Sequence, residues 1–270
     1  MPSTTVHLYR PGLVDYDDAW SWQRDAAAAL RQDSGPECLA LLQHPPVYTL
    51  GRSAKREHLL VEPADLARRG SRVVEVDRGG DVTFHGPGQL VGYPILDLRR
   101  RKLLPGDYIR RLEQTIIDAL TAFGITAERV PGRPGVWAGG GKLAAIGVRV
   151  QAGVTTHGFA LNVSTDLSWF DAIVPCGLAG TTVTSITTIS GVAPPMESIE
   201  EAVAKAFSAA FDVAFSASPA HAPAFMSGSR LTPATSGDRK GRPYVGNPAF
   251  RPGSPRQLTE AAYEAVYDGR

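Results

Sequence analysis

Hydrophobic residues recur at helical spacing in three separate segments of the chain. In the middle one, Leu112, Ile116 and Leu120 stand four positions apart, and Gly124 follows as a stop signal. Apolar side chains three to four positions apart fall on one face of a helix, which can then pack on a core. We therefore expect helices at residues 15–32, 107–123 and 197–213.

Several shorter apolar runs have the length of β-strands. They cover residues 39–43, 73–76, 125–130, 136–138, 143–150 and 155–163. Gly139, Gly140 and Gly141 stand between two of these runs and predict a hairpin turn, because glycine accepts a positive φ without steric cost. Short strands mixed with segregated helices predict an α+β (α/β) domain, built on a mixed sheet with flanking helices.

The character of the chain changes at Ser216. Pro, Ser, Gly and Ala dominate beyond this residue, and the apolar periodicity fades. Such a composition buries little apolar surface. We expect one folded domain over residues 1–215 and a Pro/Ser/Gly-rich, loosely ordered tail over residues 216–270.

Composition and charge exclude some classes of protein. The 270 residues include 28 Lys and Arg against 27 Asp and Glu, a net charge of +1, so a general nucleic-acid-binding role is not expected. No apolar run is long enough to span a membrane, and the N-terminus does not resemble a secretory signal. These features predict a cytoplasmic protein without nucleic-acid or membrane partners.

The chain has two cysteines, far apart in sequence. Cys38 begins an apolar run and is expected to be a small buried residue, whereas Cys176 stands in the turn-like sequence Val-Pro-Cys-Gly. A disulfide is not expected. Cys176 is a candidate nucleophile, and His85 or His157 is a conceivable partner that spacing alone cannot choose. A zinc site has little support, because paired cysteines and an HExxH sequence are both missing.

Three polar or glycine-rich segments are candidates for a binding site. The stretch from Arg78 to Gln89 contains four glycines and forms either a β-turn or a substrate loop. It lacks the dinucleotide-binding fingerprint.

Lys142 follows three glycines, but the sequence around it does not match the P-loop pattern. A lysine after a hairpin turn is usually a surface charge, although the apolar residues 143–147 imply a strand that enters the core. His157 and Asn162 are expected to be polar groups satisfied inside a sheet.

Four motifs in series closely resemble the lipoyl(octanoyl) transferases. They are RGGDVTFHGPGQLVGYP at residues 78–94, GKLAAIG at 141–147, HGFALN at 157–162 and IVPCG at 173–177. The resemblance runs from about Val6 to the region of Val213 and leaves out the tail. Members of this family begin protein lipoylation, and the family fold is shared with the biotin and lipoate protein ligase catalytic domains.

The resemblance implies roles for individual residues. Cys176 matches the cysteine that forms an acyl-thioester intermediate, and Lys142 matches the lysine that lowers the pKa of that cysteine. The segments that match the family's substrate-binding residues are Arg78, Gly79, Gly80, Asp81, Val82, Thr83, Phe84 and His85, then Ala145, Ile146 and Gly147, and finally Gly158, Phe159 and Ala160.

The implied reaction moves an octanoyl group from acyl carrier protein to a lysine of a lipoyl domain. Acceptors would be the lipoyl domains of 2-oxoacid dehydrogenase E2 subunits and the glycine cleavage H protein; neither a cofactor nor a metal is expected. The basic residues 99–102 and 110–111 form either a docking face for acidic partners or solvated charge. Two alternatives are an ATP-dependent lipoate or biotin ligase of the same fold and a non-catalytic module that binds acyl carrier protein.

Overall fold

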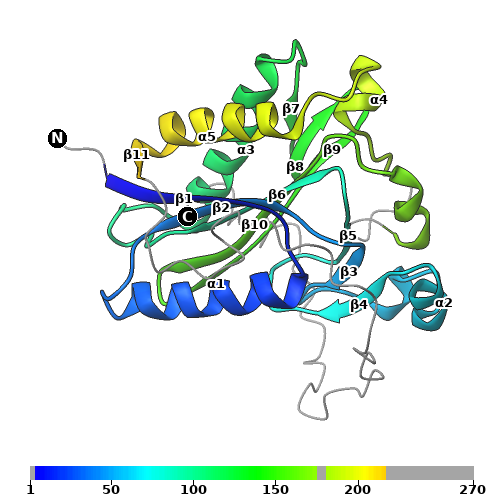
Figure 1. Ribbon diagram of the computed structural model, residues 1–270, viewed down its shortest axis with the longest axis horizontal. Helices are drawn as coiled ribbons and strands as arrows, with labels where there is room; N and C mark the ends of the chain where they lie inside the picture. Colours follow the sequence, from blue (N-terminus) through cyan, green and yellow to red (C-terminus); the bar gives the residue numbers. More distant parts are fainter. Residues whose placement is uncertain (1–3, 175–180, 217–270) are drawn as a thin grey trace.

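A computed structural model describes residues 4–174 and 181–216 of the chain (Figure 1). Within them, an eight-stranded sheet has the order β11-β1-β2-β6-β10-β9-β8-β7, and a three-stranded sheet has the order β4-β3-β5. The strands of the large sheet are β1 (Thr4–Leu13), β2 (Cys38–Gln43), β6 (Gln89–Ile95), β7 (Glu128–Val130), β8 (Arg133–Ala138), β9 (Gly141–Gln151), β10 (Val154–Asn162) and β11 (Val213–Ser216). Those of the small sheet are β3 (Val47–Leu50), β4 (Arg72–Glu75) and β5 (Val82–His85).

Helices cover both faces of the large sheet. The longer ones are α1 (Tyr16–Arg31), α3 (Pro105–Thr121) and α5 (Met196–Phe211); the shorter ones are α2 (Pro63–Arg68), α4 (Ile186–Ser190) and the 3-10 segments η1 (Arg56–His58) and η2 (Leu167–Ala172). In Figure 1, α1 runs along one face of the sheet, while α3 and α5 lie on the other. Because β1 is parallel to β2 and β11 whereas β6 to β10 pair antiparallel, the sheet is mixed, as the sequence predicts.

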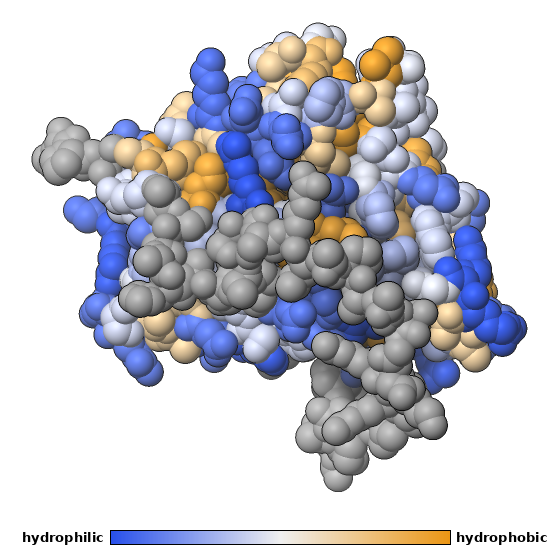
Figure 2. All heavy atoms as spheres, in the orientation of Figure 1, coloured by the Kyte–Doolittle hydropathy of each residue, from blue (hydrophilic) through white to orange (hydrophobic). Residues whose placement is uncertain are grey.

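Strand β2 shows how the sheet separates two apolar cores. Its residues Leu39 and Leu41 belong to the core under α3 and α5, whereas Ala40 and Leu42 belong to the core under α1. Successive side chains of a strand point to opposite faces, so an uninterrupted apolar run is what a strand covered on both faces requires. On the face drawn in Figure 2, hydrophilic and hydrophobic side chains are interspersed, with hydrophobic ones near α4 and near α5 and β11.

The three predicted helices are present with ends close to the expected ones. Helix α1 begins after Asp15, whose side chain accepts a hydrogen bond from the backbone N–H of Asp17, and ends before Gln32. The C-terminal bound of the last predicted helix is wrong. Asp212 takes a left-handed conformation (φ 51°) and ends α5, so Val213 belongs to strand β11 instead.

The predicted hairpin between β8 and β9 is confirmed, with Gly139 at φ 57° and Gly140 at φ 77°. Three strand predictions need correction. Of residues 125–130 only Glu128–Val130 form a strand. Strands β4 and β10 end at Glu75 and Asn162, each one residue before the predicted end. The glycine-rich stretch from Arg78 contains more structure than a turn, because it includes β5 and the start of β6 on either side of the turn at residues 86–88.

Some sequence-based predictions concern residues outside the described part of the chain. Cys176 and residues 217–270 of the expected tail are among them, whereas Ser216, predicted to begin the tail, is the last residue of strand β11. Cys38 lies inside it, is 3% exposed and forms no disulfide with any described residue. None of the helices in residues 4–174 and 181–216 combines the length and apolar character that a bilayer span requires.

Candidate active site

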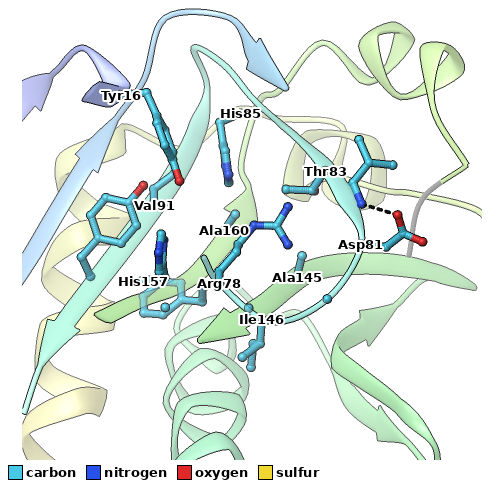
Figure 3. A pocket seen from close by; sticks show the side chains of 16 residues that line it. Tyr16, Arg78, Asp81, Thr83, His85, Val91, Ala145, Ile146, His157 and Ala160 are labelled. Carbon is cyan, nitrogen blue, oxygen red and sulfur yellow. Dashed lines mark hydrogen bonds between the residues drawn. The ribbon is translucent and has the colours of Figure 1, made fainter. Parts of the chain in front are cut away.

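A cavity of about 50 Å³ lies where the large sheet, the small sheet and α1 meet (Figure 3). Three of the four motifs, those at residues 78–94, 141–147 and 157–162, contribute to its lining although they are far apart in sequence. The sixteen lining residues are Tyr16, Arg78, Gly80, Asp81, Val82, Thr83, His85, Val91, Tyr93, Ala145, Ile146, Gly147, His157, Gly158, Phe159 and Ala160. Twelve of the fourteen predicted substrate-binding residues are among them, so the structure brings these segments together around one space.

One side of the cavity, here called the sheet wall, consists of Ala145, Ile146 and Gly147 on β9 and Gly158, Phe159 and Ala160 on β10. These residues are paired in register, with Ala160 opposite Ala145 and Gly158 opposite Gly147. Gly158 has no room for a side chain, since a Cβ atom there would lie 2.0 Å from the backbone oxygen of Gly92. Small residues therefore bring backbone close to the cavity and leave space for an apolar ligand.

The opposite side, here called the polar wall, consists of Tyr16, Arg78, His85, Tyr93 and His157. Figure 3 shows Tyr16, Arg78, His85 and His157 pointing toward the same space. Arg78 is 6% exposed and anchored on strand β3: its Nη2 donates to the Thr49 carbonyl at 2.6 Å and to Thr49 Oγ1 at 2.9 Å. Fixed hydrogen bonds of this kind hold a buried guanidinium in one orientation.

Two buried histidines, His85 in the polar wall and His44 behind it, are held neutral. His44 Nδ1 donates to the carbonyl of Val14 at 2.7 Å, which leaves Nε2 to accept a hydrogen bond from the Tyr93 hydroxyl at 2.7 Å. Burial lowers the pKa of His44 to about 4, and burial together with His44 and Arg78 lowers the pKa of His85 well below its usual value. Neither ring is suited to act as a proton acceptor for a thiol near pH 7.

His157 has a strained backbone in the middle of strand β10. Its φ of 59° lies in the left-handed region, and its backbone N–H donates to Gln23 Oε1 of α1 at 2.7 Å. The ring is 2% exposed, and Nε2 lies 2.7 Å from Asp77 Oδ1. Non-glycine residues held in this conformation concentrate at functional sites. The expectation that His157 and Asn162 are polar groups satisfied within the sheet is confirmed.

Lys142 is 7% exposed, as expected for a strand that enters the core. Its backbone N–H donates to the Thr182 carbonyl at 2.8 Å, and its carbonyl accepts from the Thr184 N–H at 3.0 Å. Its Nζ lies 5.8 Å from the centre of the Trp137 ring. Lys142 does not line the cavity itself, and stands three residues before Ala145 on the same strand.

A chain of hydrogen bonds connects the cavity to the strand position of Lys142. His85 Nδ1 donates to Gln89 Oε1 at 2.8 Å, and Gln89 Nε2 donates to Asn162 Oδ1 at 2.9 Å. Asn162 Nδ2 then donates to the carbonyl of Thr184, which pairs with Lys142. Networks of this kind fix the relative positions of the groups they join.

Two predicted residues do not line the cavity. Gly79 donates its N–H to the Val148 carbonyl at 2.9 Å, so it joins the loop to β9. Phe84 packs on the other side of β5 against Tyr48 and Trp169, each with ring centres 5.2 Å away. Four lining residues were missed as binding residues: Tyr16, Val91, Tyr93 and His157. Val91, Tyr93 and His157 carried a signal, because they stand within the quoted motifs, whereas Tyr16 lies outside them.

Within residues 4–174 and 181–216, no cluster of three or more His, Cys, Asp or Glu side chains is arranged to hold a metal ion. The carboxylate of Asp81, which lines the cavity, contacts neighbouring protein groups instead. Its Oδ1 accepts from the Val82 N–H at 2.7 Å, and its Oδ2 lies 2.5 Å from His58 Nδ1.

Comparison with known proteins agrees with this geometry. Residues 15–208 match the family model of the lipoyl protein ligase A/B catalytic domain. An octanoyltransferase of Chloroflexus aggregans is 49% identical over 200 residues, covering 73% of this chain and 90% of the relative. An octanoyltransferase of Geobacter metallireducens is 48% identical over 193 residues, covering 72% of this chain and 87% of the relative.

Solved structures share the fold at low sequence identity. A lipoate-protein ligase A bound with ATP superposes with a TM-score of 0.62 at 17% identity, covering 81% of this chain and 89% of that one. A bipartite lipoate protein ligase of Thermoplasma acidophilum gives 0.61 at 16% identity, covering 81% and 87%. The chain therefore belongs to the lipoyl protein ligase A/B family, within its octanoyltransferase branch.

Proposed function

We propose that the protein transfers an octanoyl group from acyl carrier protein to a lysine of a lipoyl domain, through a thioester on Cys176. The observation that carries this proposal is the convergence of three motif segments on one cavity with a small-residue wall. Such a cavity suits an unbranched acyl chain, because its lining is mostly apolar and strand backbone comes close to the space.

In the first step, the Cys176 thiolate attacks the carbonyl carbon of the octanoyl thioester. A carbon–sulfur bond to the enzyme forms, the bond to phosphopantetheine breaks, and the released thiol takes up a proton. In the second step, the acceptor amine attacks the enzyme thioester, so that an amide forms and the cysteine is released. Donor and acceptor supply all the atoms, and the proposed route uses no cofactor or metal.

Lys142 is the proposed activating group. A free thiol has a pKa near 8.5, and a neighbouring ammonium favours the thiolate, which is the reactive form. An acceptor lysine, with a reference pKa near 10.4, must lose a proton before it attacks, and a neutral Lys142 is the proposed base for that step.

The described residues on both sides of 175–180 support this assignment. Val174, two positions before Cys176, donates its N–H to the carbonyl of His58, whose ring contacts Asp81 in the cavity. Thr182, six positions after Cys176, pairs with Lys142. Burial lowers the pKa of both His85 and His157, which makes them weaker bases and further favours Lys142 as the activating group.

The proposed acceptors are the lipoyl domains of 2-oxoacid dehydrogenase E2 subunits and the glycine cleavage H protein. The proposed location is the cytoplasm, where a catalytic thiol stays reduced. An ATP-dependent ligase of the same fold would instead activate a free acid, so a requirement for ATP separates the two activities.

The test is to mix the protein with octanoyl-acyl carrier protein, without ATP, and to measure its intact mass. We expect the mass to rise by one octanoyl group, and the group to move to an added lipoyl domain. Cys176→Ser should form no thioester. Cys38→Ser is the matched control and should acylate normally, because burial raises the pKa of Cys38 to about 12 and keeps it a thiol. Acylation of the Cys176→Ser protein, or transfer only with ATP, would contradict the proposal.

The role of Lys142 can be tested by iodoacetamide alkylation across pH, because the resistant Cys38 leaves Cys176 as the reporter. We expect the alkylation midpoint of Lys142→Met to move upward toward the free thiol value. Lys142→Arg keeps the charge but cannot give up its proton, so it should form octanoyl-enzyme and fail in the second step. An unchanged midpoint and normal acylation in Lys142→Met would rule out both roles.

A further inference from the structure

A second cavity, of about 540 Å³, lies next to the first. Its lining combines apolar side chains with charged ones: Trp20, Leu50, Gly51, Arg52, Ala54, Glu75, Val76, Asp77 and Arg149. It contains none of the residues of the four motifs, and the proposed transfer reaction does not use it. Its volume is about ten times that of the candidate active-site cavity described above, which is called the acyl cavity from here on.

The two cavities are neighbours along several elements. Tyr16 and Trp20 lie one turn apart on α1 with ring centres 6.4 Å apart, and the first lines the acyl cavity while the second lines the larger one. The adjacent residues Asp77 and Arg78 also line different cavities: Asp77 lines the larger cavity and Arg78 lines the acyl cavity. A thin partition of side chains therefore separates the two spaces.

The partition is formed by His157 and Asp77, with Arg149 behind them. His157 lines the acyl cavity, and its Nε2 lies 2.7 Å from Asp77 Oδ1. The other oxygen of Asp77 is paired with the Arg149 guanidinium. The ring of Trp20 in the second cavity lies 6.4 Å from the His157 ring, centre to centre. The hydrogen bond from the His157 N–H to Gln23 holds the partition from the α1 side.

Strand register gives the direction from Lys142 to this partition. Along β9, Lys142 is followed by the cavity residues Ala145 to Gly147, and then by Val148, which is paired with His157. The partition therefore lies at the end of the cavity opposite Lys142. If the thioester forms at the Lys142 end, as the proposed function requires, the methyl end of the acyl chain points at His157.

We infer that His157, fixed by Asp77, closes the acyl cavity and sets the longest chain that the enzyme accepts. A chain longer than the cavity would have to displace a buried, hydrogen-bonded ring, which is costly because its partner Asp77 would lose a hydrogen bond. Removal of the ring would join the acyl cavity to the larger one, where Trp20, Leu50 and Val76 offer apolar surface to additional methylenes.

The test compares octanoyl and tetradecanoyl thioesters of acyl carrier protein as donors to His157→Ala. We expect the ratio of tetradecanoyl to octanoyl acyl-enzyme formation rates to rise by about tenfold or more, since each accommodated methylene contributes to discrimination. The matched control is Val91→Ala, because Val91 is paired with Ala160, which is paired with Ala145 toward the Lys142 end of the cavity. This variant should leave the ratio within about twofold. Asp77→Ala opens the partition from the other side and should raise the ratio in the same direction.

A binding measurement separates this inference from the proposed function. Tetradecanoic acid with bromine on its terminal carbon should quench Trp20 fluorescence in His157→Ala, and should not do so in the unmodified protein or in His157→Ala/Trp20→Phe. If no acyl-enzyme forms but the brominated acid quenches Trp20 fluorescence in His157→Ala, the proposed function is refuted and the role of His157 as a partition is supported. An unchanged chain-length ratio in both folded partition variants, without quenching, would refute the partition alone.

Discussion

The two walls of the candidate active-site cavity are built in opposite ways. At its two glycines the sheet wall is shaped by the absence of a side chain: Gly158 allows its strand to approach Gly92, and Gly147 lies against Arg78. The polar wall is shaped by large side chains, each fixed by a hydrogen bond or by ring packing, as with Arg78 on Thr49 and His157 on Asp77. Close backbone packing therefore shapes the sheet wall, whereas hydrogen bonds to Arg78, His85, Tyr93 and His157 and the ring packing of Tyr16 position the polar wall.

This difference predicts how each wall fails. A substitution in the sheet wall adds atoms where no space exists, and backbone cannot move aside without disturbing the ladder between β6 and β10. A substitution in the polar wall removes a partner and leaves a buried polar group unsatisfied. The first kind should act mainly on folding, and the second on both folding and reaction rate.

The largest effect is expected for Gly158→Ala. The new Cβ would lie 2.0 Å from the Gly92 backbone oxygen, so the free energy of unfolding should fall by at least about 3 kcal/mol. Urea unfolding measures this loss. In the control Gly147→Ala, the nearest atoms are at 3.1 Å, and a loss of about 1 kcal/mol is expected. Equal losses in the two variants would mean that backbone contact does not limit the sheet wall.

An intermediate effect is expected for Arg78→Lys. A single ammonium cannot replace the hydrogen bonds to Thr49 Oγ1, the Thr49 carbonyl and the Gly79 carbonyl, so unfolding should become easier by about 1.5–3 kcal/mol. The rate of octanoyl-enzyme formation should fall by about 10- to 100-fold because the polar wall loses its position. Normal kinetics in a destabilised variant would show that this wall has a structural role only.

The smallest effect concerns pH. The pKa of His44 is about 4 in the folded protein and about 6.5 when unfolded, so the unfolded state binds more protons between these values. The contribution of neutral His44 to the free energy of unfolding is therefore fully present above pH 6.5 and is lost as the pH falls toward 4. About 1 kcal/mol of it should be lost between pH 7 and 5.5. His44→Gln, which keeps a donor and an acceptor, should reduce the pH dependence of urea unfolding by that amount. The same dependence in both proteins would contradict a neutral buried His44.

Sequence patterns predicted the sheet wall better than the polar wall. The small residues of β9 and β10 stand within contiguous motifs, so one resemblance identified them together. Tyr16 and Tyr93 reach the cavity from an amphipathic helix and an apolar strand, where their side chains read as ordinary core residues. Periodicity states which face is buried, but not that a cavity lies beneath it.

Elements with long periodic apolar runs were predicted from the sequence. Strands whose pairing partners lie far away along the chain were not. Helices α1 and α3 follow local periodicity. Strands β1 and β11 do not, because each depends on a partner that only the tertiary structure provides. The basic run at residues 99–102 shows the same limit. The Arg101 side chain is only 9% exposed, pairs with Glu37 and donates to the Phe211 carbonyl, so this residue holds the fold together.

The parallel pairing of β1 with β11 has a consequence for the newly made chain. Thr4 pairs with Val213, and Ser216 Oγ lies 3.2 Å from His7 Nδ1 across a sequence separation of 209 residues. During synthesis, the outer edge of β1 must therefore remain without its partner until almost the entire domain has left the ribosome, and so distant a pairing forms slowly. An unpaired edge is a template for strands of other chains. A chain that stops before Val213 should therefore associate with its own copies even though it contains every residue that lines the candidate active-site cavity.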